Sequence, residues 1–322
     1  MTHFFWTIGP KDNFKSRDLR LKELSHSVTS FKSQFKKEAT YTVLIVDGGV
    51  ISIYCMDGEY PYHLRIFEAP KYYQRIYQLF DSFIDNLIKR FEKVDPRFQT
   101  PTAYRNTKYV GIFNYLIYLH ESDLNLSNLY FVDNDTVCIK KFNISITEPM
   151  SCVKHDYTPG KSLVGSYLDM VEGEDAHRRL VFKHNDGILK LSGLSPKVLI
   201  YFVRKILPSL LSSPKLSKAL ENYEGAFGTT ELMWGLLYYT GWLSEPLPSS
   251  LNQLCPPHLL RALTEYYTFK KTAFAAIRDN THILHFVSNT NTSLYENLPA
   301  FVARSIGPVN ERSFLEFFRE EN

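Results

Sequence analysis

The strongest pattern along the chain is an amphipathic segment between residues 71 and 93. Large apolar side chains recur there at steps of three and four, namely Ile76, Phe80, Phe83, Ile84, Leu87, Ile88 and Phe91. Residues at this spacing lie on one stripe of an α-helix, and charged residues fill most of the remaining positions. The pattern predicts a long amphipathic helix, which needs a partner surface to cover its apolar stripe.

Two strand-like runs immediately before this segment supply such a surface. Apolar and β-branched residues dominate Tyr41–Tyr54, and a Gly-Gly pair after Asp47 interrupts them in the manner of a hairpin turn. A third run, residues 62–67, follows a turn at Asp57-Gly58. We therefore expect an α+β fold in which an N-terminal β-hairpin or sheet packs on the long amphipathic helix, followed by a mostly helical C-terminal part.

The remaining N-terminal segments give weaker patterns. Residues 1–10 resemble a short apolar arm, and residues 11–38 suggest one or two helical turns followed by a Ser-rich break. Tyr109–Leu119 is apolar on nearly all sides, which predicts a buried helix. Residues 129–132 and 137–144 predict two strands around a turn at residues 133–135.

Beyond residue 193 the pattern is mostly helical. Apolar spacing predicts helices over residues 196–211, 231–243 and 258–277, a short strand over 282–287, and a last helix over 311–318. We expect this last helix to dock on another subunit or on another part of the chain. The predicted division is an α/β domain with a basic N-terminal segment (1–150), an irregular linker or insertion (151–193) and a mostly helical domain (194–322).

Composition narrows the class of protein only in part. The formal net charge of +3 is too small to indicate an anionic partner by itself, whereas the 15% aromatic content is high. Four scattered cysteines are no disulfide framework. The N-terminus lacks the features of a signal peptide, and no apolar run is long enough to span a bilayer. We expect a soluble, cytoplasmic protein without membrane contact.

Clusters that interleave aromatic and basic side chains favour nucleic-acid binding. Cationic groups neutralise phosphates while rings stack on unpaired bases, so such clusters suit single-stranded RNA better than duplex RNA. The alternative is that the rings belong to the core and the lysines extend along its surface. The candidate residues are Lys32, Phe35, Lys36, Lys37, Lys71, Tyr72, Arg75, Arg105, Lys108, Tyr266, Lys270 and Lys271.

Candidate metal ligands are few in the sequence. Cys152 and His155 form one pair with ligand-like spacing, and Cys255 and His258 form another, so the four could build a zinc site if they met in space. The pair His282 and His285 is better explained as partly buried strand residues. Metal-dependent nucleases place an acid on one strand and Glu-x-Lys on the next, but here Asp47 is followed by Glu68 and Lys71, which are one residue too far apart. We assign no metal, cofactor or catalytic residue.

One short segment, His120 to Asn128, resembles the catalytic loop of protein kinases. In that family an Asp and an Asn five residues later act as base and metal ligand, and Asp123 and Asn128 have this spacing. The metal-binding Asp-Phe-Gly of the family would fall on residues 141–143, where Lys141 replaces the essential acid. A capped turn explains the same residues, so we do not assign the chain to this family.

These observations together predict a non-enzymatic, self-associating accessory protein that binds RNA or another polyanion. A virus-encoded non-structural protein would be of this type. The expected partners are RNA and further copies of the chain. The alternatives are a degenerate nucleotide-binding or kinase-like enzyme around Asp123 and Asn128, and a protein–protein scaffold without nucleic-acid binding.

Overall fold

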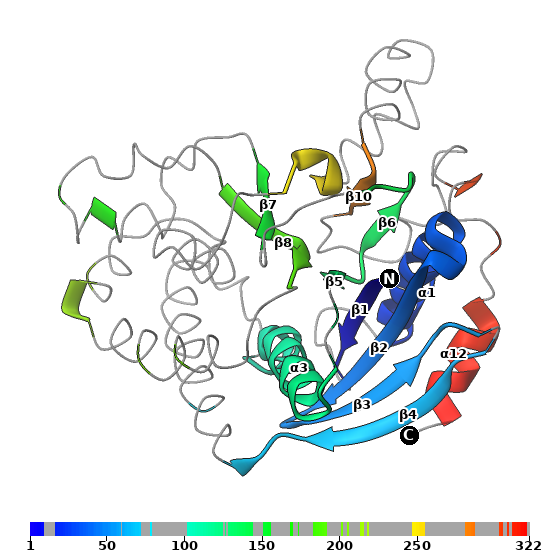
Figure 1. Ribbon diagram of the computed structural model, residues 1–322, viewed down its shortest axis with the longest axis horizontal. Helices are drawn as coiled ribbons and strands as arrows, with labels where there is room; N and C mark the ends of the chain where they lie inside the picture. Colours follow the sequence, from blue (N-terminus) through cyan, green and yellow to red (C-terminus); the bar gives the residue numbers. More distant parts are fainter. Residues whose placement is uncertain are drawn as a thin grey trace, which may run out of the picture.

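A seven-stranded mixed sheet organises the described part of the chain (Figure 1). The computed structural model describes residues 1–9, 17–58, 60–71, 102–124, 128–143, 151–155, 183–191, 247–254, 281–286 and 311–320, together with a few isolated residues. The strands of this sheet are β1 (Thr2–Ile8), β2 (Ala39–Asp47), β3 (Val50–Cys55), β4 (Tyr62–Glu68), β5 (Asn128–Val132), β7 (Ser151–His155) and β8 (Lys183–Lys190). Their order across the sheet is β4-β3-β2-β1-β5-β8-β7.

A second, smaller sheet lies beside the first one. It contains β6 (Thr136–Cys138), β10 (Ile283–His285) and β9 (Gln253–Leu254), in the order β6-β10-β9. β10 pairs antiparallel with β6 and parallel with β9, which follows the 3₁₀-helix η5 (Ser249–Leu251). Because β6 comes directly after β5, the chain passes from the large sheet to the small one through residues 133–135.

Strand β1 is the centre of the large sheet and is parallel to both of its neighbours, β2 and β5. Its side chains from Phe4 to Ile8 are all buried, because helices cover both faces. A strand buried on two faces reads as a continuous apolar run instead of an alternating one. This explains why HFFWTI, predicted as an apolar arm, forms the central strand.

Helix α1 (Arg17–Phe35) connects β1 to β2 and covers one face of the sheet (Figure 1). Phe31 and Phe35 pack on Phe4, with ring centroids 4.8 and 4.9 Å from it. The short 3₁₀-helix η1 (Lys36–Glu38) then leads into β2. This crossover buries the apolar stripe of α1 against β1, β2 and β5, and so builds the main core.

Serines inside α1 are satisfied within the structure. The hydroxyls of Ser25 and Ser30 donate to backbone carbonyls one turn earlier, over 2.7 and 2.6 Å. Ser27, also buried, accepts a 2.8 Å hydrogen bond from the indole Nε1 of Trp6. The Ser-rich break predicted in this region is therefore wrong, since these hydroxyls bond locally without ending the helix.

Helix α3 (Thr102–Glu121) covers the opposite face and leads toward β5 (Figure 1). It approaches the strands closely at Gly111, where an added Cβ would lie 2.6 Å from Cγ2 of Thr7 and 2.8 Å from Cγ2 of Val46. The Asn114 amide donates to the carbonyl of Gly49 in the β2–β3 turn, over 2.8 Å. The sheet is thus the middle layer between α1 and α3.

The C-terminal helix α12 (Glu311–Glu320) packs beside α1 (Figure 1). Phe317 and Phe318 contact the ring of Tyr54 on β3, at centroid distances of 5.8 and 5.2 Å. The predicted helix over residues 311–318 is confirmed, and it docks on another part of the same chain.

The predicted fold class is wrong. The hairpin of β2 and β3 is present, but it belongs to a mixed sheet whose described covering layers are α1, α12 and α3. The predicted long helix over 71–93 lies almost wholly outside the described residues, as do the helices expected over 196–211, 231–243 and 258–277. Described residues after 150 contribute β7 and β8 to the same sheet, β9 and β10 to the smaller one, and the helix α12.

Several shorter predictions are confirmed. The runs 62–67 and 129–132 form β4 and β5, the apolar segment 109–119 lies in α3, and a short strand occurs within 282–287. Two strands do flank the expected turn at residues 133–135, but the second one, β6, ends at Cys138 and not at residue 144, and it belongs to the smaller sheet. The division into three regions stays a prediction. None of the helices in the described ranges has the length and apolar character needed to cross a bilayer.

A buried histidine on β1, His3, joins β2 to α3. The imidazole Nδ1 of His3 lies 2.6 Å from the Thr40 hydroxyl, and its Nε2 lies 2.8 Å from the Tyr115 hydroxyl. Burial lowers the pKa of His3 to about 4, against a smaller opposing effect of the Asp57 charge. The folded protein therefore holds His3 neutral.

We expect His3 to make stability depend on pH in a defined window. Its pKa is near 6.5 in an unfolded chain and about 4 in the folded protein, so the unfolded state binds more protons between these values. The stabilisation is complete above about pH 6.5 and is lost as the pH falls toward 4, by roughly 3 kcal/mol in total. Urea unfolding across pH 4–7.5 should give a steeper loss in the parent than in His3→Gln, and equal slopes would contradict this origin.

Candidate metal centre

The turn between β5 and β6, residues 133–135, is held in place by backbone and side-chain hydrogen bonds. The Asp133 N–H donates to the carbonyl of Gly187 on β8, over 2.9 Å. Asn134 Nδ2 donates to the carbonyl of Thr7 near the end of β1, over 3.0 Å. The Thr136 hydroxyl donates to the Asp133 carbonyl over 2.7 Å. We call this segment the aspartate turn, because its two carboxylates are fixed beyond the carboxyl end of β5.

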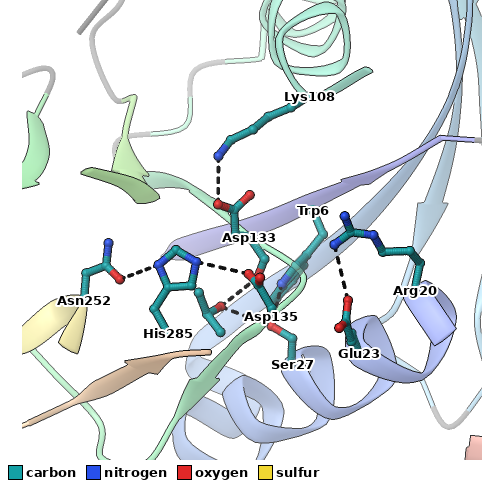
Figure 2. A network of polar contacts seen from close by, with 10 residues as sticks. Trp6, Arg20, Glu23, Ser27, Lys108, Asp133, Asp135, Asn252 and His285 are labelled. Atoms are coloured by element: carbon teal, nitrogen blue, oxygen red, sulfur yellow. Dashed lines mark hydrogen bonds and ion pairs between the residues drawn. The ribbon is translucent and has the colours of Figure 1, made fainter. Parts of the chain in front are cut away.

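Three potential metal ligands meet at the aspartate turn. Ligand atoms of Asp133, Asp135 and His285 all lie within 4.8 Å of one another. His285 comes from β10, where it pairs with Thr136 of β6, so the small sheet carries the ring to the turn. Its Nε2 lies 3.2 Å from Oδ1 of Asp135, as Figure 2 shows. Among the described residues, this is the group of side chains suited to hold a cation.

A buried amide holds the other side of the imidazole. The Nδ1 of His285 lies 2.9 Å from Oδ1 of Asn252, and Figure 2 shows the ring between Asn252 and Asp135. Asn252 is fully buried, and His285 is 7% exposed. The backbone N–H of Phe286, the next residue, donates to the Asp135 carbonyl over 2.9 Å. Both the ring and its backbone are therefore tied to the turn.

Gly187 on β8 leaves the space that these two side chains occupy. A Cβ at this position would lie 2.5 Å from Nδ1 of His285 and 2.8 Å from Nδ2 of Asn252. Such separations are far below van der Waals contact, so the strand needs glycine here for a close approach. The same residue accepts the hydrogen bond from the Asp133 N–H.

Charges at the site partly compensate one another. Lys108 reaches from α3 to Asp133, with Nζ 2.8 Å from Oδ2 (Figure 2). The same Nζ lies 5.0 Å from the centroid of the Phe131 ring. Burial acts to lower the pKa of His285, but the nearby Asp135 carboxylate outweighs it and the net shift is upward. Two half-buried carboxylates are thus balanced by a lysine and a histidine that favours its charged form.

The donor set fits a divalent cation. Carboxylate oxygens suit Mg²⁺ and Mn²⁺, whereas imidazole suits first-row transition ions, so Mn²⁺ is an ion that accepts both types of ligand. A site with three protein ligands leaves coordination positions for water or a bound substrate, as in catalytic rather than closed structural centres. The chemistry of Asp133, Asp135 and His285 therefore allows both cation binding and a further ligand on the cation.

The location of the aspartate turn also favours ligand binding. β1 leads through α1 to β2 on one side, whereas β5 on the other side follows α3, which covers the opposite face. In sheets of this kind, ligands bind beyond the carboxyl ends of the strands at the point where the connections diverge. The aspartate turn lies at that point, next to the end of β1.

The residues predicted to bind nucleic acid do not gather at this site. Phe35 belongs to the core, and Lys32 donates to the carbonyls of Met56 and Gly58, over 2.7 and 2.9 Å. Lys36 and Lys37 are exposed on η1, and Lys71 is exposed after β4. Among the predicted residues whose side chains the structure describes, Lys108 is the one that reaches the cluster, through Asp133. Tyr72, Arg75, Tyr266, Lys270, Lys271 and the side chain of Arg105 lie outside the described residues, so the list as a set stays a prediction.

Two other candidate sites have different outcomes. Asp123 lies in the turn after α3 with a φ of 55°, and Asn128 begins β5, so both lie at the opposite end of this strand from the aspartate turn. The segment is a turn in which the N–H groups of Ser122 and Asp123 donate to carbonyls of α3. Cys255, His258 and the side chains of Cys152 and His155 lie outside the described residues, so the zinc site stays untested.

The sequence pattern predicts residues 133–135 only as a turn, so the aspartate turn is not among the candidate sites identified from the sequence. Two carboxylates separated by one residue, directly after a buried strand, already form a candidate cation site. His285 was correctly expected in a buried strand, but nothing in the sequence connects it to a turn 150 positions earlier. The antiparallel pairing of β10 with β6 makes that connection.

Comparison with known proteins gives matches at the level of structure only. No protein-family model matches the sequence, and no curated protein matches it. An active-site mutant of LgtC is similar with a TM-score of 0.43 and 10% identity, over 99% of this chain and 96% of that chain. The WbbM bifunctional glycosyltransferase gives 0.41 and 12%, over 98% of this chain and 51% of its own. Mouse xyloside xylosyltransferase 1 gives 0.38 and 10%, over 90% and 99%.

These matches correct the predicted function. The similar chains include glycosyltransferases, so the expectation of a non-enzymatic, RNA-binding or virus-type scaffold protein finds no support in them and is not carried further. At such TM-scores the likeness carries no argument about the activity of this chain, which has to come from its own site. Self-association stays a prediction.

We expect Gly187→Ala to lower the free energy of unfolding through steric overlap at the candidate metal centre. The new methyl group would overlap His285 and Asn252, both buried, and relief requires a shift of β8 or of the two side chains. Overpacking of this kind costs about 1–3 kcal/mol in the free energy of unfolding, measured by urea titration. The matched control is Gly49→Ala, where nothing lies within 4 Å of the added Cβ. Equal losses in both variants would contradict the steric account.

Proposed function

We propose that the chain is a metal-dependent glycosyltransferase whose donor site is the aspartate turn with His285. The cluster of Asp133, Asp135 and His285 beyond the carboxyl end of β5 is the observation that carries this proposal. The expected cofactor is a divalent cation such as Mn²⁺, and the expected donor is a sugar linked to a nucleoside diphosphate.

The charges of the cluster favour a bound cation. Asp133 and Asp135 place two carboxylates within 4.8 Å of a histidine, so a cation held there would be attracted by both like charges. Lys108 reaches one carboxylate of the pair, at Asp133. A divalent ion bound by both carboxylates and by Nε2 of His285 would stabilise the arrangement and leave coordination positions open.

The position of the cluster favours a diphosphate donor. Phosphorylated ligands bind beyond the carboxyl ends of strands in sheets of this type, where backbone N–H groups and bound cations compensate their charge. A cation at the aspartate turn would neutralise the negative charge that develops on a diphosphate leaving group. That the diphosphate belongs to a sugar donor is suggested by the glycosyltransferases among the similar structures.

The proposed reaction is balanced without a further reactant. The bond between the anomeric carbon of the sugar and the diphosphate oxygen breaks, and its electron pair leaves with the nucleoside diphosphate. An acceptor hydroxyl forms the new bond to the anomeric carbon and releases its proton. In this scheme Asp133, Asp135 and His285 bind and orient the donor side, and Lys108 holds the Asp133 carboxylate in position.

We expect cation-dependent binding and turnover of a nucleoside diphosphate sugar. In a panel of uridine, guanosine and other diphosphate sugars, at least one should raise the melting temperature in the presence of Mn²⁺ and not with EDTA. Release of nucleoside diphosphate from that donor should fall by at least about 100-fold in Asp135→Asn, since one of the carboxylate ligands is lost.

Asp123→Asn is the matched control for this experiment. Asp123 is an exposed carboxylate at the opposite end of β5, and asparagine tolerates its positive φ. The variant should keep the parent's turnover, whereas a kinase-like site around Asp123 would make it inactive. Failure of every donor to bind with Mn²⁺, or unchanged turnover in Asp135→Asn, would contradict the proposed function.

A further inference from the structure

We propose that Asn252 is a positioning residue that commits His285 to bind the cation through Nε2. The inference rests on the proposed function, because it assigns a role toward the same cation. It adds a residue that contacts the imidazole of His285, on the side of the ring away from Asp135.

The hydrogen bond between the two side chains selects the tautomer. Oδ1 of Asn252 is an acceptor only, and it lies 2.9 Å from Nδ1 of His285. When the ring is neutral, as it must be to ligate a cation, its proton therefore resides on Nδ1 and its lone pair on Nε2. That nitrogen is the one that faces Asp135, at 3.2 Å from its Oδ1.

The opposite orientation of the amide would have the opposite effect. With its NH₂ group against Nδ1, Asn252 would donate, and the neutral ring would have to carry its proton on Nε2. A protonated nitrogen cannot ligate a cation. The orientation of one buried amide thus decides whether His285 belongs to the metal site or only borders it.

Backbone pairing and packing hold the amide where this role requires it. Asn252 lies between η5 and β9, and β9 pairs in parallel with β10, so that Leu254 is the register partner of His285. On the other side, β8 passes at Gly187, so close that a Cβ there would meet both side chains. The pair is enclosed by three elements, and Asn252 has no exposed surface.

The test compares two substitutions in the full chain by calorimetric titration with Mn²⁺ alone. Asn252→Leu keeps the approximate volume and removes the acceptor, so Mn²⁺ affinity should fall by roughly 10–100-fold, the range for lost partners of metal-bound histidines. Asn252→Asp keeps an acceptor in the same place and should retain the parent affinity or exceed it. Thermal melting of each variant monitors folding, and Asn252→Ser replaces the leucine variant if that protein does not fold.

A double-mutant cycle separates positioning from a general structural effect. In a His285→Ala background, Asn252→Leu should cause no further loss of Mn²⁺ affinity, because its action passes through the missing imidazole. A structural role would instead give the same additional loss in both backgrounds.

The outcomes distinguish this inference from the proposed function. A parent protein that does not bind Mn²⁺ overturns both. A parent that binds Mn²⁺ while Asn252→Leu retains full affinity, or while the two losses are additive, overturns the role of Asn252 and leaves the metal site intact. A lower affinity in Asn252→Leu, kept in Asn252→Asp and absent in the His285→Ala background, supports it.

Discussion

The parallel pairing of β1 with β2 and β5 is the constraint on which the rest of the structure depends. It places a strand without polar alternation between two helical layers, where Phe4 and Trp6 meet α1 and Phe5 meets Tyr115 of α3. The same pairing sets the end of β5 beside the end of β1. The aspartate turn is then fixed by Asn134, whose amide donates to the carbonyl of Thr7.

The candidate site joins the two sheets of the described structure. Asp133 and Asp135 belong to the passage from β5 to β6, whereas His285 and Asn252 come from segments more than a hundred residues later. Their contact depends on β6, β9 and β10, which are only two or three residues long. Strands of this length do not fix side-chain positions by themselves. The close packing against Gly187 and the hydrogen bond between His285 and Asn252 therefore hold the imidazole in place.

Local patterns were sufficient to predict several elements and insufficient to arrange them. The hairpin of β2 and β3 follows from β-branched residues around a Gly-Gly turn, and burial of residues 109–119 follows from their apolar character. The layers could not be predicted, because β1 lacks alternation and because the serines of α1 suggest a break. In the structure those hydroxyls bond to carbonyls within the helix or accept from Trp6.

The site itself depends on sequence-distant contacts. A carboxylate pair after a buried strand is visible in the sequence, but its third ligand and the supporting amide are identified only by strand pairing. Basic and aromatic residues gave a misleading functional pattern for the same reason. Phe35 is core and Lys108 compensates Asp133, roles that depend on what lies beside them and not on their neighbours in sequence.

The most direct test of the account is anomalous diffraction from a crystal of the full chain grown with Mn²⁺. The account predicts an anomalous peak within about 2.0–2.3 Å of carboxylate oxygens of Asp133 and Asp135 and of Nε2 of His285. A crystal saturated with Mn²⁺ that shows no peak at the aspartate turn, or one that excludes His285, would contradict it.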